Sequence, residues 1–284
     1  MTLAEIGPGR GTLMADMLRT LDRLDAGFVT RARIAMVEAS PRLADIQRER
    51  LASGRGRPTW FCDLAALPRL PLVVVGNELF DALPVRQFVR TARGWRERMV
   101  GLGEDGGFAF VAGIAGIDPA LLPPEAAEAP EGAVFEVSPA REALMDAVAT
   151  RIAADGGAAL FIDYGHLRPG LGDTLQAVRD HAYDGIFAHP GAADLTSHVD
   201  FAALAHVAAM HGLEATTTTQ GQFLLGLGLI ERAGALGAAA GEDVRERLRG
   251  EVERLAGPDA MGNLFKVICV SRRGVRLPPF AAPA

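Results

Sequence analysis

The chain has 284 residues, of which 49% are hydrophobic and 23% are charged, and its formal net charge is −6. This length allows one large domain or two small ones, and the composition excludes whole-chain disorder and fibrous repeats. The acidic balance argues against a nucleic-acid partner, and no apolar run approaches the roughly 20 residues that a membrane-spanning helix needs. The first residues form no signal-peptide pattern, and Cys62 and Cys269 form no disulfide framework, so we expect a cytoplasmic protein.

The first segment predicts a strand, a glycine-rich turn and a helix. Residues 3–6 are short and apolar, and Gly7-Pro8-Gly9-Arg10-Gly11 follows at once. Apolar residues then recur at helical spacing and predict an amphipathic helix. These residues are Leu13, Met14, Met17, Leu18, Leu21 and Leu24.

Each of the next three predicted strands ends at a polar residue. The run at 72–75 is β-branched, as is typical of a strand that is covered on both faces. Ser40-Pro41 predicts the N-cap and first position of a helix between two of these strands. The strands and the residues that follow them are 34–37 with Glu38, 60–62 with Asp63, and 72–75 with Asn77-Glu78.

The strand–helix alternation returns in the second half of the chain and predicts a doubly wound, mostly parallel α/β sheet with right-handed crossovers. We expect one domain over residues 1–273, with a flexible tail at 274–284. Two segments, at about 86–133 and 166–199, break the alternation and predict insertions, the first of which begins with a hairpin at 86–90 and 95–100. The expected elements are helices at 144–152, 201–207 and 244–255, and strands at 158–162, 215–219 and 264–271.

The glycine-rich turn is a candidate ligand site, because ligands of doubly wound sheets bind at the carboxyl ends of the strands. Glycines let a ligand approach the backbone, and a helix N-terminus presents free N–H groups to it. Glu38, at the tip of the second strand, has a carboxylate that can accept hydrogen bonds from both ribose hydroxyls of a nucleoside. Asp63 has two open interpretations, an acceptor for an adenine amine and a helix cap.

Several motifs together resemble one family. Glu5-Ile6-Gly7-Pro8-Gly9-Arg10-Gly11-Thr12 is similar to the first motif of class I S-adenosylmethionine (SAM) methyltransferases. Asn77-Glu78-Leu79-Phe80-Asp81-Ala82-Leu83-Pro84-Val85 resembles the signature of the MidA-like branch, which methylates proteins during assembly of respiratory complex I. Further similar stretches are Asp163-Tyr164-Gly165-His166, Gly172 to Ala177, Gly191 to Phe201 and Gln220 to Leu224.

The resemblance implies a Rossmann-like methyltransferase that uses SAM to methylate an arginine of a complex I core subunit, the one next to the quinone site. The glycines would cradle the methionine portion of SAM, Glu38 would hold its ribose and Asp63 its adenine. The residues expected to bind the cofactor are Glu5, Gly7, Pro8, Gly9, Gly11, Glu38, Asp63 and Asn77.

Transfer to a guanidinium needs carboxylates that orient the acceptor nitrogen and take up a proton, because the guanidinium lone pair is delocalised. We expect Glu78 and Asp163 on this acceptor side, together with Asp81 and Tyr164. Asp81 has a second interpretation as the cap of a short turn, and Tyr164 has one as a residue that packs over the edge of the sheet.

Two other functions stay open at this point. The resembling family has a further N-terminal region ahead of the first strand that closes over the cofactor, and this chain begins at that strand. The resemblance therefore also allows an inactive, non-catalytic assembly factor with a retained fold.

A nicotinamide-dependent oxidoreductase shares the glycine turn and the acid after the second strand, but its glycine spacing is wider. A metal site at Asp194, His198 and Asp200 is disfavoured, since no histidine pair has ligand spacing on one helix.

Overall fold

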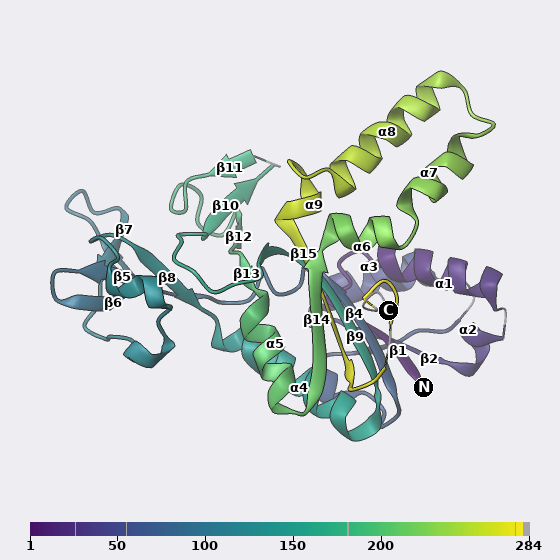
Figure 1. Cartoon of the computed structure of the whole chain (residues 1–284), viewed down its shortest axis with the longest axis horizontal. Coiled ribbons are helices and arrows are strands. Elements are labelled where there is room, and N and C mark those ends of the chain that lie inside the picture. Colours follow the sequence, from purple (N-terminus) through teal and green to yellow (C-terminus); the bar gives the residue numbers. More distant parts are fainter. Residues whose placement is uncertain (26, 55, 181, 276, 281–284) are drawn as a thin grey trace.

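A computed structural model of the chain describes residues 1–280 except 26, 55, 181 and 276. Its centre is an eight-stranded sheet in which β13 pairs with β9 and the other strands follow the order β14-β15-β9-β4-β1-β2-β3 (Figure 1). The strands are β1 (Thr2–Ile6), β2 (Arg33–Val37), β3 (Thr59–Phe61), β4 (Leu72–Asn77), β9 (Gly157–His166), β13 (Val199–Asp200), β14 (Leu213–Thr219) and β15 (Phe265–Arg272).

The sheet is parallel except at β15. β1 pairs with β2 and β4, and β4 pairs with β9, all in parallel register. β15 runs antiparallel between β9 and β14. The predicted mostly parallel, doubly wound α/β fold is confirmed, and the carboxyl ends of β1, β2, β4 and β9 come together at one edge of the sheet.

Helices cover both faces of this sheet (Figure 1). α1 (Thr12–Leu24), α2 (Phe28–Arg31) and α3 (Pro41–Leu51) lie on one face, and α4 (Pro139–Asp155) and α5 (Phe201–Met210) on the other. Alternate residues of a strand point to opposite faces. Accordingly, Leu3 packs with the α1–α3 core, whereas its neighbour Ala4 packs with the α4–α5 core.

The helix starts follow local capping chemistry. The Ser40 hydroxyl accepts from the Leu43 backbone N–H at 3.4 Å, with Pro41 in the first turn of α3. The Asp200 carboxylate accepts from Ala202 and Ala203 at the start of α5. These side chains use N–H groups that a helix leaves unpaired at its beginning, and the predicted N-cap at Ser40 is confirmed.

The first inserted segment extends past its predicted end at 133, to Val137, and forms a four-stranded antiparallel sheet. The second forms a three-stranded sheet, and both lie to the left in Figure 1. The predicted hairpin is confirmed as β5 and β6, whereas the sequence pattern gave no signal for the other five strands. His181 and the end of the tail lie outside the described residues. The strands are β5 (Arg86–Thr91), β6 (Gly94–Leu102), β7 (Phe108–Ala112), β8 (Val134–Val137), β10 (Gln176–Arg179), β11 (Ala182–Asp184) and β12 (Asp194–Thr196).

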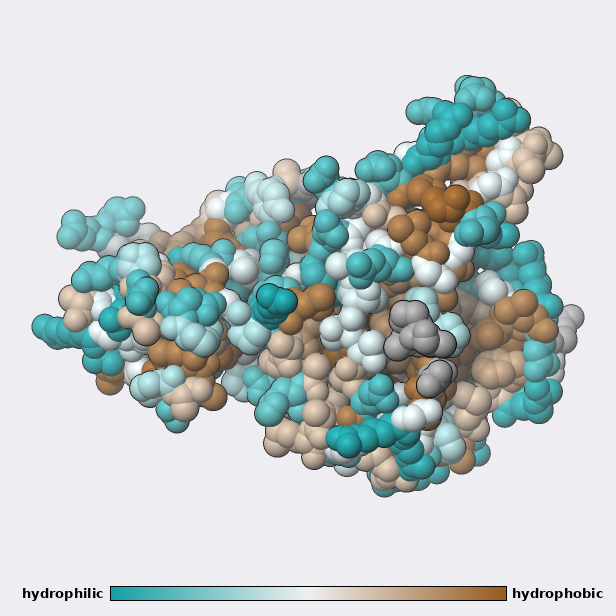
Figure 2. Space-filling view, viewed as in Figure 1, coloured by the Kyte–Doolittle hydropathy of each residue, from teal (hydrophilic) through white to brown (hydrophobic). Residues whose placement is uncertain are grey.

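A helical hairpin projects from the sheet at the upper right of Figure 1. It consists of α7 (Leu229–Gly237) and α8 (Glu242–Ala256), which are joined to the body by α6 (Gln220–Gly226) and α9 (Met261–Leu264). Figure 2 shows apolar surface along the hairpin, where Ile230, Leu248 and Val252 help to line a groove of about 550 Å³. In the part of the chain that the structure describes, no helix is long and apolar enough to cross a membrane.

Candidate active site

The loop between β1 and α1 turns sharply at three glycines. Gly7, Gly9 and Gly11 have φ angles of 64°, 52° and 74°, a left-handed conformation that glycine adopts without a steric penalty. The Gly7 N–H donates to the Val37 carbonyl, and the Gly11 N–H donates to the Pro8 carbonyl. These bonds fix the loop beside the end of β2.

The three glycines have different surroundings. A Cβ at Gly7 would lie 2.8 Å from Leu79 Cδ1, and a Cβ at Gly11 would lie 3.3 Å from Gln47 Cγ. A Cβ at Gly9 would have no described heavy atom within 4 Å. Gly7 and Gly11 therefore admit neighbouring side chains of the protein, whereas Gly9 leaves open space at the carboxyl edge of the sheet for a ligand.

Glu38 lies one strand over and is held by two hydrogen bonds. Its Oε1 accepts from the Ser40 N–H at 2.8 Å, and its Oε2 accepts from Gln47 Nε2 at 3.0 Å. The same Gln47 Nε2 donates to the Gly9 carbonyl at 2.8 Å. A carboxylate has about four acceptor sites, so Glu38 keeps the capacity to bind ribose hydroxyls.

Glu5 lies beneath the loop, at the end of β1. It is 3% exposed, and its Oε2 is buried without a hydrogen-bond partner among the described residues. Burial raises the pKa of Glu5 to about 7, and a hydrogen bond from the Met14 backbone lowers it in part. A buried acceptor that the protein itself leaves unpaired points to a ligand or an ordered water at this position.

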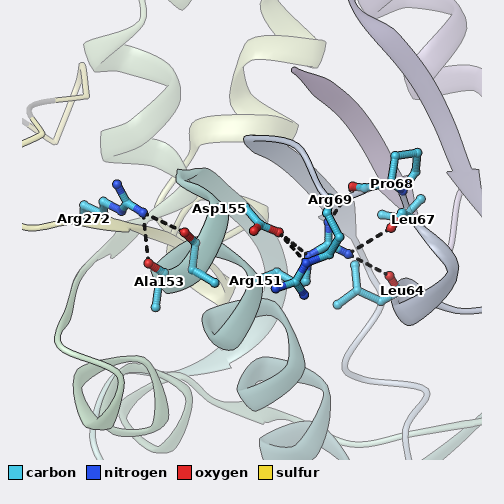
Figure 3. Close-up of polar contacts among 9 residues, drawn as sticks. Leu64, Leu67, Pro68, Arg69, Arg151, Ala153, Asp155 and Arg272 are labelled. Atoms are coloured by element: carbon cyan, nitrogen blue, oxygen red, sulfur yellow. Dashed lines mark hydrogen bonds and ion pairs between the residues drawn. The ribbon is translucent and has the colours of Figure 1, made fainter.

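Asp63 is exposed and caps the turn η1 (Leu64–Ala66), where its Oδ1 accepts from the Ala66 N–H at 2.8 Å. The helix-cap interpretation is therefore confirmed, while its predicted contact with adenine remains a prediction. This turn is anchored from α4, as Figure 3 shows. Arg151 donates to the carbonyls of Leu64, Leu67 and Pro68 and pairs with Asp155.

The end of β4 carries Asn77 and Glu78. Asn77 Nδ2 donates to Glu78 Oε1 at 3.0 Å, and the Glu78 side chain is exposed. Glu78 has a φ of 49°, an unfavourable conformation for a residue with a side chain. Such strain is found at functional sites, where the surrounding structure enforces it, and here it presents an exposed carboxylate beside the glycine loop.

Asp163 does not face an acceptor. It is fully buried, and its Oδ2 accepts from the N–H groups of Leu79, Phe80 and Asp81 at 2.9–3.2 Å. Its Oδ1 accepts from the Tyr164 N–H. Burial, with the nearby charge of Asp81, raises the pKa of Asp163 to about 7. The expectation that Asp163 touches the acceptor is corrected, because its oxygens hold the loop after β4 in place.

Asp81 and Tyr164 form a buried pair. The Tyr164 hydroxyl donates to Asp81 Oδ2 at 2.7 Å, and burial raises the pKa of Tyr164. Asp81 Oδ1 is buried without a partner in the described part of the chain. The Tyr164 ring also packs edge-on against His198 and Phe265. Tyr164 thus packs at the edge of the sheet, which confirms that interpretation, while its expected place on the acceptor side stays a prediction.

Two of the three residues considered as metal ligands, His198 and Asp200, make structural contacts. Asp200 caps α5, and His198 packs against Tyr164. Among the described residues, no group of three or more histidines, cysteines and acids is arranged to hold a metal.

Two buried residues of this edge gave no signal in the sequence. Gln47 is fully buried on α3, and Arg141 is 4% exposed on α4. A lone polar residue on a helix face usually predicts exposure, so only the tertiary packing shows that both reach the loops of the site.

The chain matches known proteins over most of its length. A family model described as "Putative S-adenosyl-L-methionine-dependent methyltransferase" matches residues 1–219. The zebrafish mitochondrial protein arginine methyltransferase NDUFAF7 is 31% identical over 95% of this chain and 68% of its own length. The mouse protein of that name is 33% identical over 93% of this chain and 65% of its own length. The chain thus spans about two thirds of these relatives.

Solved structures of similar proteins agree with these sequence matches. An uncharacterized superfamily protein from Burkholderia thailandensis has a TM-score of 0.78 and 32% identity, over 95% of this chain and 74% of that chain. A second crystal structure from that organism, with S-adenosyl-homocysteine bound, has a TM-score of 0.77 and 32% identity, over 95% of this chain and 71% of that chain. With its glycine loop, its strand-end carboxylates and these relatives, the chain belongs to the family of S-adenosyl-L-methionine-dependent methyltransferases.

Proposed function

We propose that the protein transfers a methyl group from SAM to an arginine side chain of another protein, the complex I core subunit next to the quinone site. Relatives named protein arginine methyltransferase support the arginine acceptor, and the resemblance of the 77–85 motif supports the complex I subunit. One observation carries the proposal: two acidic side chains of different exposure, Glu78 and Asp81, lie within one short loop beside the glycine turn.

The residues of the cofactor side fit SAM. Gly9 leaves open space at the loop, Glu38 offers a carboxylate to ribose hydroxyls, and Glu5 has a buried, unpaired oxygen within the described residues. When bound, SAM supplies a methyl group that its sulfonium already activates, so the protein needs no covalent intermediate. The nicotinamide alternative is set aside, because the chain belongs to a SAM-dependent family.

The acceptor side holds and orients the guanidinium. The exposed Glu78 carboxylate is the first to meet an incoming arginine, and a charge-assisted hydrogen bond fixes one of its nitrogens. The nitrogen must lie in line with the breaking S–CH3 bond at about 3–3.5 Å. A carboxylate of this loop would take up the proton that the acceptor nitrogen releases once it carries the methyl group, and SAM would leave as its thioether.

The competing function is a non-catalytic assembly factor with the same fold. The test incubates the protein with radiolabelled methyl-SAM and the recombinant complex I core subunit next to the quinone site. Transfer of label to arginine supports the enzyme, and mass spectrometry locates the modified residue. Binding of the subunit without label would leave only the assembly-factor role.

The cellular location stays a prediction. Cys62 and Cys269 are both free thiols, which supports a reducing compartment such as the cytoplasm. Fractionation of cells followed by immunodetection of the protein tests this.

A further inference from the structure

A buried acid, Asp163, and a buried base, Arg141, bind the same stretch of backbone from its two sides. The Asp163 carboxylate accepts from the N–H groups of Phe80 and Asp81 at 2.9 and 3.2 Å. The Arg141 guanidinium donates to the carbonyls of the same two residues, from Nε to Phe80 at 2.7 Å and from Nη2 to Asp81 at 3.1 Å. The N–H groups and the carbonyls of this segment are therefore both held by buried charges.

Arg141 also reaches a second loop. Its Nη1 donates to the His198 carbonyl at 2.6 Å, and its Nη2 donates to the carbonyl and the hydroxyl of Ser197 at 2.9 and 2.7 Å. The Ser197 N–H in turn donates to the Asp81 carbonyl at 3.3 Å. One guanidinium thus joins the loop after β4 to the loop before β13.

Both charges are removed from water. Arg141 is 4% exposed and Asp163 is fully buried, and burial lowers the pKa of Arg141. Buried charged groups are weak evidence of stabilisation, because apolar side chains of similar volume often stabilise a fold as well. We therefore look for the role of these two side chains in the loop geometry that they fix, and not in a gain of stability.

The residue fixed by this arrangement is Asp81. Its N–H, its carbonyl and its Oδ2 are bound by Asp163, Arg141 and Tyr164 respectively. Only Oδ1 stays without a partner among the residues that the structure describes. We infer that Arg141 is a positioning residue for methyl transfer, which acts with Asp163 through the backbone to hold the Asp81 carboxyl in its reactive placement. This inference rests on the proposed function.

The test replaces Arg141 by lysine, which cannot reach both loops with one ammonium group. We expect amide hydrogen exchange in segments 79–84 and 195–199 to rise about tenfold. We also expect kcat to fall at least about tenfold, while the affinity for SAM measured by calorimetry stays within about twofold. The activity assay uses the recombinant core subunit named above. A merely structural role would change kcat and the affinity for SAM together, or would change neither of them.

A matched control lies at the other end of α4. Arg272 Nη2 donates to the carbonyls of Ala153 and Ala154 at 3.0 and 3.2 Å, in the last turn of the helix that carries Arg141 in its first turn (Figure 3). Arg272→Gln also removes guanidinium–carbonyl bonds at this helix, and we expect it to change neither kcat nor exchange in the two segments.

A second variant covers the case in which Arg141→Lys does not fold. Ser197→Ala removes one acceptor of Arg141, and we expect exchange in both segments to rise and kcat to fall about threefold. Unchanged exchange, or unchanged kcat with raised exchange, would overturn the inference. If the wild-type protein labels no arginine, the proposed function fails separately, and the exchange measurement alone then decides whether Arg141 joins the two loops.

Discussion

Gln47 binds Glu38 and the glycine loop with the same amide nitrogen. Its Nε2 donates to Glu38 Oε2 at 3.0 Å and to the Gly9 carbonyl at 2.8 Å. Its Oε1 accepts from the Trp60 ring N–H at 2.8 Å. This buried amide therefore sets the position of the predicted ribose acceptor relative to the glycine loop, which we expect to face the rest of the cofactor.

Replacing Gln47 by leucine keeps the volume and removes these hydrogen bonds. We expect the affinity for S-adenosyl-homocysteine to fall about tenfold, because Glu38 and Gly9 lose their common partner. We also expect the free energy of unfolding to fall by about 1–3 kcal/mol, the cost of leaving buried polar groups unpaired. Calorimetry and urea denaturation measure the two effects. The same substitution at the exposed Gln222 is the control. An affinity of Gln47→Leu for S-adenosyl-homocysteine within twofold of wild type would contradict the prediction.

The sequence was sufficient for the sheet and for the strand-end acids, because hydrophobic periodicity and turn residues are local signals. It could not distinguish the roles of Asp163 and Asp81. Both are acids at or shortly beyond the end of a strand predicted from the sequence, and only the pairing of β9 with β4 shows that Asp163 binds the backbone N–H groups of the neighbouring loop. The guanidinium of Arg141, which reaches loops about 60 positions away in the sequence, is equally invisible to local patterns.

Glu38→Gln tests the predicted contact with ribose. The variant keeps the size of the side chain and loses the charge that makes its acceptors strong. We expect the affinity for S-adenosyl-homocysteine to fall about tenfold or more by calorimetry, with the melting temperature nearly unchanged. Glu49→Gln, an exposed change on the next helix, serves as the control. Equal affinities in wild type and Glu38→Gln would show that Glu38 does not bind the ribose.

The variants Gly7→Ala and Gly9→Ala distinguish a glycine needed for packing within the protein from a glycine needed for access of the ligand. Both positions have a positive φ, which costs alanine about 1 kcal/mol or more. At Gly7 the new methyl group also meets Leu79, so we expect the larger loss in the free energy of unfolding there. At Gly9 the methyl group enters open space, so we expect weaker binding of S-adenosyl-homocysteine with a smaller loss of stability. The reverse order of stabilities would contradict this assignment.

The substitutions Asp81→Asn and Glu78→Gln distinguish the parts that these two acids of the loop after β4 play in the reaction. We expect Asp81→Asn to lower kcat about 100-fold with little change in SAM affinity, because it alters the buried carboxyl that Tyr164 holds. We expect Glu78→Gln to raise the KM for the protein substrate about tenfold, since it removes the exposed charge that we propose binds the guanidinium. Steady-state kinetics with the labelled methyl group separates the two effects. An Asp81→Asn variant with wild-type kcat would exclude Asp81 from the reaction.

The raised pKa of Glu5 predicts how stability depends on pH. Its ordinary value of 4.5 is raised to about 7 by burial, so the folded protein binds this proton more tightly than the unfolded chain does. The resulting stabilisation is fully present below about pH 4.5 and is lost as the pH rises through 7.

Glu5→Gln removes this proton-linked loss. Asp163 titrates in the same range, so the comparison that isolates Glu5 is the difference between the two pH profiles. We expect Glu5→Gln to exceed the wild type by about 1–3 kcal/mol in the free energy of unfolding at pH 8, with the gap closing below pH 4.5. Urea denaturation across this range measures it. Parallel profiles would mean that Glu5 ionises in the folded protein as readily as in the unfolded chain, and its buried Oε2 would then need another explanation.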